Sequence, residues 1–150
     1  MSAEVRRAEL GDLPALARLC ADHAQYERAP HDPDGHIERL SAALFDPAPR
    51  ALAWVAQVDG EIVGYASGAV EFSTWTAREF LHLDCLYLDD RARGGGLGSD
   101  LLDAVRAEAR DRGLVSVQWW TPDWNDGAVR FYERHGARAE PRTRFVLDLR

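Results

Sequence analysis

A glycine-rich segment constrains this chain more than any other: residues 93–98 read Arg-Gly-Gly-Gly-Leu-Gly, and Ser99 follows. Residues 80–88 before it are apolar and β-prone, which predicts a strand, and residues 97–109 place leucine and valine on one helical face. Such a turn bares backbone N–H groups at the positive end of a helix, and glycine lets an anion approach the backbone. We therefore expect a phosphate or pyrophosphate site here, with Arg93 adding positive charge.

Other glycine motifs fit this segment less well. A P-loop needs Gly-Lys-Ser/Thr, and the chain contains no lysine. The dinucleotide fingerprint G-x-G-x-x-G belongs to an early βαβ unit, whereas this segment comes late, after several other elements. The pattern Arg-x-x-Gly-x-Gly/Ala matches residues 93–98, and an ordinary strand-to-helix turn is the open alternative.

Length and composition bound the class of protein. The 150 residues predict a single domain, 1–150, and 46% hydrophobic with 29% charged residues is typical of a globular protein. No apolar run approaches the roughly 18 residues of a membrane span, and the first residues do not resemble a signal peptide. A net charge of −7 disfavours nucleic acid as a partner. Two cysteines are too few for a metal cluster or a disulfide framework, so we expect a cytoplasmic protein without a metal.

The order of predicted elements is antiparallel strands followed by a βαβ crossover, which predicts a mixed α/β fold. Asp12 is the expected N-cap of the first helix, Asp59-Gly60 the turn of a hairpin, and Gly113 and Gly136 the ends of two later helices. The predicted strands are residues 4–9, 50–58, 61–72, 80–88, 114–121 and 143–149, and the predicted helices are residues 12–25, 36–44, 97–112 and 125–135.

A second motif, Asn125-x-x-Ala128-x-x-Phe131-Tyr132-x-x-x-Gly136, follows the second strand of the crossover. Core packing explains Phe131 well, because Ala128, Phe131 and Tyr132 share one helical face. Tyr132 differs, because its helix follows the strand ends where ligands of such sheets bind. The two motifs together are far more specific than either alone.

From end to end the chain resembles the GCN5-related N-acetyltransferases, the GNAT superfamily. Residues 93–98 resemble the coenzyme A loop of that family, and residues 125–137 resemble its N-x-x-A-x-x-F-Y-x-x-x-G-F/A segment. Tyr26-Glu27, Leu83-Asp84 and Trp124-Asn125 resemble the spermidine/spermine and thialysine acetyltransferase branch. The resemblance implies a mixed, mostly antiparallel sheet of about seven strands with about four helices. It also implies direct transfer of acetyl from acetyl-CoA to an amine in a ternary complex.

The resemblance also implies roles for individual residues. The backbone of residues 86–88 would pair with the pantetheine arm, an N–H near Leu86 would polarise the thioester carbonyl, and Tyr132 would protonate the departing thiolate. An acidic residue, usually Glu in that branch, deprotonates the amine; here it is Asp84, one methylene shorter. Tyr26 and Glu27 would contact the acceptor, and C-terminal strands would form a homodimer. The residues implied to bind the cofactor are Leu86, Tyr87, Leu88, Arg93, Gly94, Gly95, Gly96, Leu97, Gly98, Ser99, Asn125, Ala128 and Tyr132.

The chemistry of the acceptor side is consistent with a carboxylate. An amine with a pKa near 10 is charged at neutral pH and must lose a proton before it attacks. Asp84 suits that task, and Glu27, His82, His31 or a chain of water molecules are the alternatives.

Aromatic residues complete the acceptor side. Trp120 and Trp75 are candidate aromatic walls, and for Trp75 a loop anchor or a dimer contact is an equal alternative. The expected acceptor is a polyamine, a diamine or an amino acid. An aminoglycoside, a protein amine, or a non-catalytic acyl-CoA-binding sensor are the competing interpretations.

Overall fold

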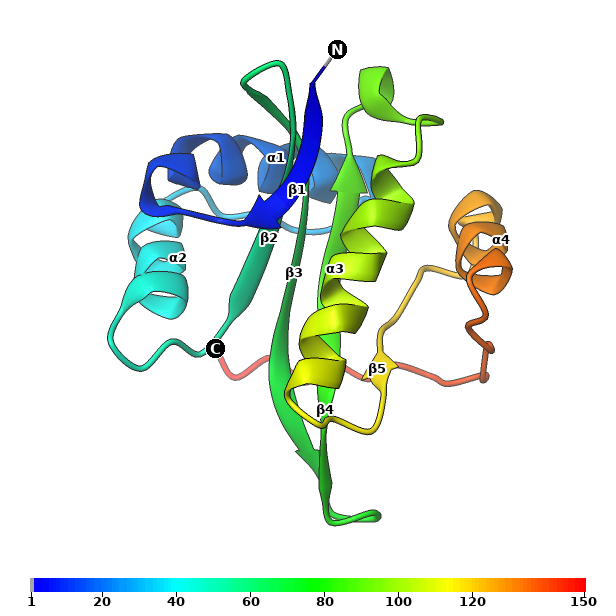
Figure 1. The fold of residues 1–150 in the computed structure, drawn as a ribbon. Coiled ribbons are helices and arrows are strands. Elements are labelled where there is room, and N and C mark those ends of the chain that lie inside the picture. The colour runs from blue at the N-terminus through cyan, green and yellow to red at the C-terminus, as the bar shows by residue number, and fades with distance from the viewer. Residues whose placement is uncertain (1) are drawn as a thin grey trace. The chain divides into compact units, whose positions relative to one another are not determined.

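The computed structural model describes residues 2–150, which divide into two compact units. The first ends at Trp120, and the second comprises residues 121–150. The first unit holds the whole sheet and all but one of the helices (Figure 1). The expectation of a single domain stays a prediction. None of the described helices is long and apolar enough to span a membrane.

The first unit is built on one mixed sheet with the strand order β1-β2-β3-β4-β5. Neighbouring strands run antiparallel except β4 and β5, which are parallel. This confirms the mixed α/β class. The elements are β1 (Ala3–Arg7), the 3-10 turn η1 (Leu10–Asp12), α1 (Leu13–Tyr26), α2 (His36–Phe45), β2 (Leu52–Val58), β3 (Glu61–Ser73), β4 (Arg78–Leu88), the 3-10 turn η2 (Asp90–Ala92), α3 (Leu97–Asp111) and β5 (Val117–Gln118).

Helices cover both faces of this sheet (Figure 1). α3 lies along one face, with Leu101 and Val105 fully buried. α1 and α2 lie on the other, where their leucines pack with inward residues of β2 and β3. Hydrophobic burial on both faces therefore fixes the sheet between two helical layers. The cluster under α1 and α2 contains Leu16, Leu19, Leu44, Ala53, Val55, Ile62 and Tyr65.

The sheet has five strands, fewer than the predicted seven or so. Residues 114–121 shorten to β5, which pairs with β4 only at Leu81 and His82. Residues 143–149 form no strand in the described second unit, whose one helix is α4 (Asp126–Arg134). Phe145, Leu147 and Leu149 are each at least 85% exposed, so their alternation has no sheet to bury it. An alternating sequence does not form a stable strand unless a neighbouring strand pairs with it.

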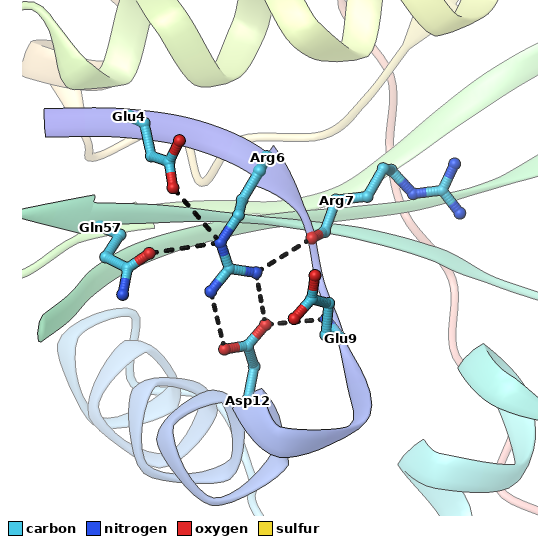
Figure 2. Close-up of polar contacts among 6 residues, drawn as sticks. All are labelled: Glu4, Arg6, Arg7, Glu9, Asp12 and Gln57. Carbon is cyan, nitrogen blue, oxygen red and sulfur yellow. Dashed lines mark hydrogen bonds and ion pairs between the residues drawn. The ribbon is translucent and has the colours of Figure 1, made fainter. Parts of the chain in front are cut away.

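Asp12 does not cap α1 with its side chain, contrary to the prediction. Its carboxylate accepts two hydrogen bonds from the Arg6 guanidinium, at 2.8 and 3.1 Å, and one from the Glu9 N–H at 2.7 Å (Figure 2). These bonds close the turn between β1 and α1. The Arg6 guanidinium holds the pKa of Asp12 below its ordinary value, although burial opposes the shift.

A β-bulge interrupts β4 at Asp84. Ser67 of β3 lies opposite Cys85, and the next residue, Gly68, lies opposite Leu83, so Asp84 has no partner in the register. Gly68 is required there, because a Cβ at that position would stand 2.5 Å from the carbonyl oxygen of His82. Bulges redirect a side chain and locally end pairing, and this one lies on β4, the strand that precedes the glycine loop.

Candidate functional site

The glycine loop between η2 and α3 has the conformation that only glycine adopts readily. Gly94 and Gly96 have φ of +84° and +91°, and Gly96 is the N-cap of α3. The N–H of Asp100 donates to the carbonyl of Gly96 at 3.0 Å, so the N–H groups before Asp100 precede the first intrahelical bond. A Cβ built at Gly94, Gly95 or Gly96 meets no described atom within 4 Å. The loop is exposed and open, which fits the approach of a pyrophosphate to backbone amides.

Arg93 ties the start of this loop to α1 and β4. Its Nε donates to the carbonyl of Leu88 at 3.0 Å, and its guanidinium pairs with Asp90 at 2.8 Å. The guanidinium carbon lies 4.8 Å from the ring centre of Tyr26 and 5.5 Å from that of Tyr87. Arg93 is therefore engaged with two aromatic rings and with Asp90, in addition to standing at the loop entrance.

The backbone of β4 ahead of the loop has one open edge. Residues 86–88 pair with β3 on one side, opposite Ala66, Tyr65 and Gly64. On the other side β5 reaches only Leu81 and His82, so among the described residues no strand pairs with residues 83–88 there. An extended ligand can add to such an edge by main-chain hydrogen bonds. The segment predicted to hold a pantetheine arm therefore lacks a strand partner on this second side.

Asp84 projects from the bulge into solvent, with its side chain 71% exposed. Its Oδ1 lies 4.0 Å from Nε2 of His82, and the Cys85 thiol donates to its Oδ2 at 3.7 Å. Neither contact satisfies the carboxylate fully, since the first is long and the second is a weak thiol bond. Asp84 thus remains able to bind a cation, with the His82 ring nearby but beyond hydrogen-bond distance.

The two cysteines of the chain are not activated nucleophiles. Burial raises the pKa of Cys85 to about 12, and burial also raises the pKa of the Cys20 thiol. The negative charge of Asp84 contributes to both increases. Both cysteines pack against the core cluster that contains the buried Tyr65. Because the thiolate is the reactive form, a covalent intermediate on cysteine is disfavoured at neutral pH.

Tyr26 and Glu27, predicted as a pair, contact different partners at the end of α1. Tyr26 lies beneath Arg93, whereas Glu27 accepts a 3.0 Å hydrogen bond from Nε2 of His23. His23 is buried, 8% exposed, and its ring stacks on Tyr87 with centres 4.9 Å apart. Sequence reasoning missed His23, although its spacing of four residues before Glu27 on one helix signals such a contact.

Among the described residues, no hydrogen bond, ion pair or ring contact joins the remaining candidates to this cluster. Trp75 occupies the turn between β3 and β4, 92% exposed, and the strand between it and Asp84 spans roughly 20 Å. Trp120 follows β5 and is 61% exposed. His31 stacks edge-on against His36 in the segment before α2, with ring centres 4.9 Å apart. The structure does not join any of them to Asp84, and their roles stay predictions.

The second unit carries the other motif. Asn125 is the N-cap of α4, and its side-chain oxygen accepts a 3.2 Å hydrogen bond from the N–H of Ala128. The rings of Phe131 and Tyr132 meet edge to face, 5.3 Å between centres. Gly136, with φ of +89°, follows the end of the helix as predicted. Asn125 therefore has a local structural role, and the cofactor role implied for it stays a prediction.

Known proteins resemble the chain over most of its length. The profile of the acetyltransferase (GNAT) family matches residues 16–137. A thialysine N-epsilon-acetyltransferase from Sus scrofa is 32% identical over 142 residues, which cover 89% of this chain and 83% of the relative. A D-amino-acid N-acetyltransferase from Saccharomyces cerevisiae is 26% identical, covering 87% and 81%. The crystal structure of a possible acetyltransferase from Clostridium difficile 630 has a TM-score of 0.83 at 21% identity, covering 99% of each chain.

Proposed function

This chain belongs to the acetyltransferase (GNAT) family, as an acetyl-CoA-dependent N-acetyltransferase, and we propose that its acceptor is the primary amine of a small cationic molecule. The proposed class of acceptor comprises polyamines, diamines and amino acids. The observation that carries this proposal is Asp84, an exposed carboxylate on a bulge of β4, inside the segment with the open edge and two residues before residues 86–88.

Acetyl-CoA, when bound, supplies the acetyl group as a thioester, whose C–S bond is exchanged for the C–N bond of the product. The residues present fit such a group: the open loop 94–96 and the start of α3 for the pyrophosphate, and the unpaired edge of residues 86–88 for the pantetheine arm. An N–H near Leu86 is proposed as the donor to the thioester oxygen. Asn125, Ala128 and Ser99 are proposed as further contacts.

Asp84 is proposed to bind the ammonium of the acceptor and to remove its proton. A carboxylate stabilises the charged amine by ion pairing, and a relayed proton leaves the neutral amine that can attack. His82, 4.0 Å from Asp84, is the nearest group that could take the proton further. The raised pKa values of both thiols support direct attack rather than a cysteine intermediate. Tyr132 is proposed to return a proton to the departing thiolate.

Two relatives support an amine on a small molecule as the acceptor. Their names give thialysine and D-amino acids as what those proteins acetylate. Tyr26 and Glu27 are proposed to contact the acceptor beside Asp84. Trp75 is proposed as an aromatic contact only for a longer acceptor, because most of β4 separates it from Asp84. Trp120, two residues after the partner of His82, is proposed as an aromatic contact on the β5 side.

We also propose a cytoplasmic homodimer. The two free cysteines are compatible with a reducing compartment, and the exposed Phe145, Val146, Leu147 and Leu149 offer apolar surface for pairing of C-terminal segments. Light scattering at assay concentration is expected to give twice the 16.8 kDa of one chain. A particle of a single chain would contradict the dimer.

The proposed activity is tested by thiol release from acetyl-CoA over a panel of amines. Linear diamines and basic amino acids are expected to be acetylated, with product confirmed by mass spectrometry. Turnover only on an aminoglycoside or on a peptide lysine would replace the acceptor proposed here. Acetyl-CoA binding without turnover on any amine would favour a sensor.

A further inference from the structure

A chain of buried polar contacts leads from the sheet to Glu27. Nδ1 of His23 lies 3.0 Å from the Tyr65 hydroxyl, and Nε2 of His23 lies 3.0 Å from Oε2 of Glu27. His23 and Tyr65 are 8% and 2% exposed, and both rings contact Tyr87. Nothing in the proposed reaction uses His23, yet it is one of two buried polar or charged side chains among the described residues.

The hydrogen bonds assign the protons of this chain. An ionised carboxylate only accepts, so Nε2 of His23 carries the proton shared with Glu27. Burial raises the pKa of Tyr65 far above its ordinary value, so its hydroxyl keeps its proton. With the ring proton on Nε2, Nδ1 is the accepting nitrogen of His23, and the Tyr65 O–H therefore donates to Nδ1. Tyr65 thus donates a hydrogen bond to His23, and His23 donates one to Glu27.

The hydrogen bond from His23 uses one oxygen of the Glu27 carboxylate and leaves the other, Oε1, for a ligand. Among the described residues, His23 is the one side chain that bonds the Glu27 carboxylate, through Oε2. The Glu27 side chain is 30% exposed, so Oε1 remains able to accept from a cation. His23 donates from Nε2 whether its ring is neutral or cationic. This hydrogen bond fixes the rotamer of the Glu27 side chain, which is otherwise flexible.

Glu27 and Asp84 lie at the two ends of one contact chain. Asp84 contacts Cys85, and Cys85 packs against the core cluster that contains Tyr65. Tyr65 in turn hydrogen-bonds with His23, and His23 with Glu27. Every link lies in the first unit. Two carboxylates held on one framework suit an acceptor with two positive charges, one at the reacting amine and one at the far end.

We propose that His23 is a positioning residue that holds Glu27 to bind the second, non-reacting cation of the acceptor. The proposal rests on the proposed function, since it names the element that makes a diamine or a basic amino acid a better acceptor than a monoamine. Asp84 serves the reacting amine, and Glu27, oriented by His23 and Tyr65, serves the other charge.

Steady-state kinetics with a linear diamine and the monoamine of equal chain length test this role. The His23→Leu variant removes the donor at similar volume, and we expect its KM for the diamine to rise about tenfold. Its kcat, its KM for acetyl-CoA and its KM for the monoamine are expected to change less than about threefold. The His23→Gln variant places an amide N–H near the position of Nε2 and is expected to recover most of the affinity for the diamine. Adding Glu27→Gln to His23→Leu should cause little further loss, because both remove the same contact.

Each other outcome has a definite meaning. An unchanged KM for the diamine in folded His23→Leu, or an equal rise for diamine and monoamine, would overturn the proposal. Nitrogen NMR of the His23 ring in the wild type tests it without a variant: a proton on Nδ1 alone would also overturn it. A wild type that acetylates no amine would instead overturn the proposed function, and leave the NMR result as the test of the hydrogen-bond chain.

Discussion

The guanidinium carbon of Arg93 lies 4.8 Å from the centre of the Tyr26 ring, so the residue that opens the glycine loop contacts the residue that ends α1. The same guanidinium stands 5.5 Å from the ring centre of Tyr87 on β4. Tyr26 is proposed to contact the acceptor and Arg93 the cofactor. One cation–π contact therefore joins the two halves of the proposed site.

A change at Tyr26 is expected to reach the cofactor through Arg93. Exposed cation–π contacts contribute about 0.5–1 kcal/mol, so Tyr26→Leu should raise the KM for acetyl-CoA about two- to fivefold. Tyr26→Phe keeps the ring face and serves as the matched control, with a KM near that of the wild type. Equal increases of this KM in Tyr26→Leu and Tyr26→Phe would contradict the cation–π role and show that the Tyr26 hydroxyl, and not the ring face, supports cofactor binding.

A side chain at Gly96 is expected to weaken cofactor binding through the backbone. Its φ of +91° disfavours any residue with a Cβ, while the space around it is open. The left-handed conformation costs about 1–2 kcal/mol, so Gly96→Ala should weaken acetyl-CoA binding about five- to thirtyfold by reshaping the loop. Calorimetric titration measures this. Gly113→Ala is the matched control, because Gly113 has φ of +70° in equally open space at the other end of α3. An unchanged affinity in folded Gly96→Ala would remove the loop from the binding site.

The Arg6–Asp12 pair predicts how stability depends on pH. The pKa of Asp12 is lowered in the folded protein, so its contribution is present above the unfolded pKa and is lost as the pH falls through the folded pKa. Asp12→Asn should lower the free energy of unfolding by about 1.5–3 kcal/mol at neutral pH, and the difference from wild type should shrink below about pH 4.

Denaturant unfolding at several pH values measures that difference. Glu140→Gln removes an exposed ion pair with Arg138 and should change the free energy of unfolding by less than about 1 kcal/mol. A difference between wild type and Asp12→Asn that stays constant from neutral to acidic pH would contradict the role given to the Asp12 charge.

Local signals in the sequence predicted most of the fold. The hairpin at Asp59-Gly60, the glycine loop and the helix ends at Gly113 and Gly136 were confirmed, because each depends on backbone conformations that few residues adopt. The prediction of a strand at residues 143–149 was wrong. Alternation of apolar residues indicates which face would be buried, but it does not supply a strand to pair with. The N-cap role of Asp12 failed because Arg6, on a separate element, competes for its carboxylate.

The candidate site was predictable in its residue types but not in its contacts. Asp84 could be proposed from its chemistry, yet the bulge that aims it depends on Gly68, sixteen residues earlier on another strand. The bond between His23 and Tyr65 spans 42 residues and has no signature in the sequence. Contacts of this kind are set by the register of β3 and the docking of α1.

Loss of the Tyr132 hydroxyl is expected to affect turnover and not binding. If Tyr132 protonates the departing thiolate, Tyr132→Phe should lower kcat by about 10²–10⁴ while the melting temperature and the affinity for acetyl-CoA change little. Presteady-state thiol release separates chemistry from product release. Near wild-type rates where chemistry limits would mean that water protonates the thiolate and that Tyr132 only packs against Phe131.

The pH dependence of kcat/KM for Asp84 variants tests the central claim most directly, measured on one diamine and one weakly basic amine. If Asp84 binds the ammonium and relays its proton, Asp84→Asn should bind acetyl-CoA normally but lose about 10²–10⁴ in kcat/KM on the diamine at neutral pH. The remaining activity should rise with pH, since solvent must then supply the free amine, and the weakly basic acceptor should suffer less. Asp84→Glu should retain more activity than Asp84→Asn. Identical profiles for wild type and Asp84→Asn on both acceptors would contradict the account and assign the proton to Glu27, His82 or water.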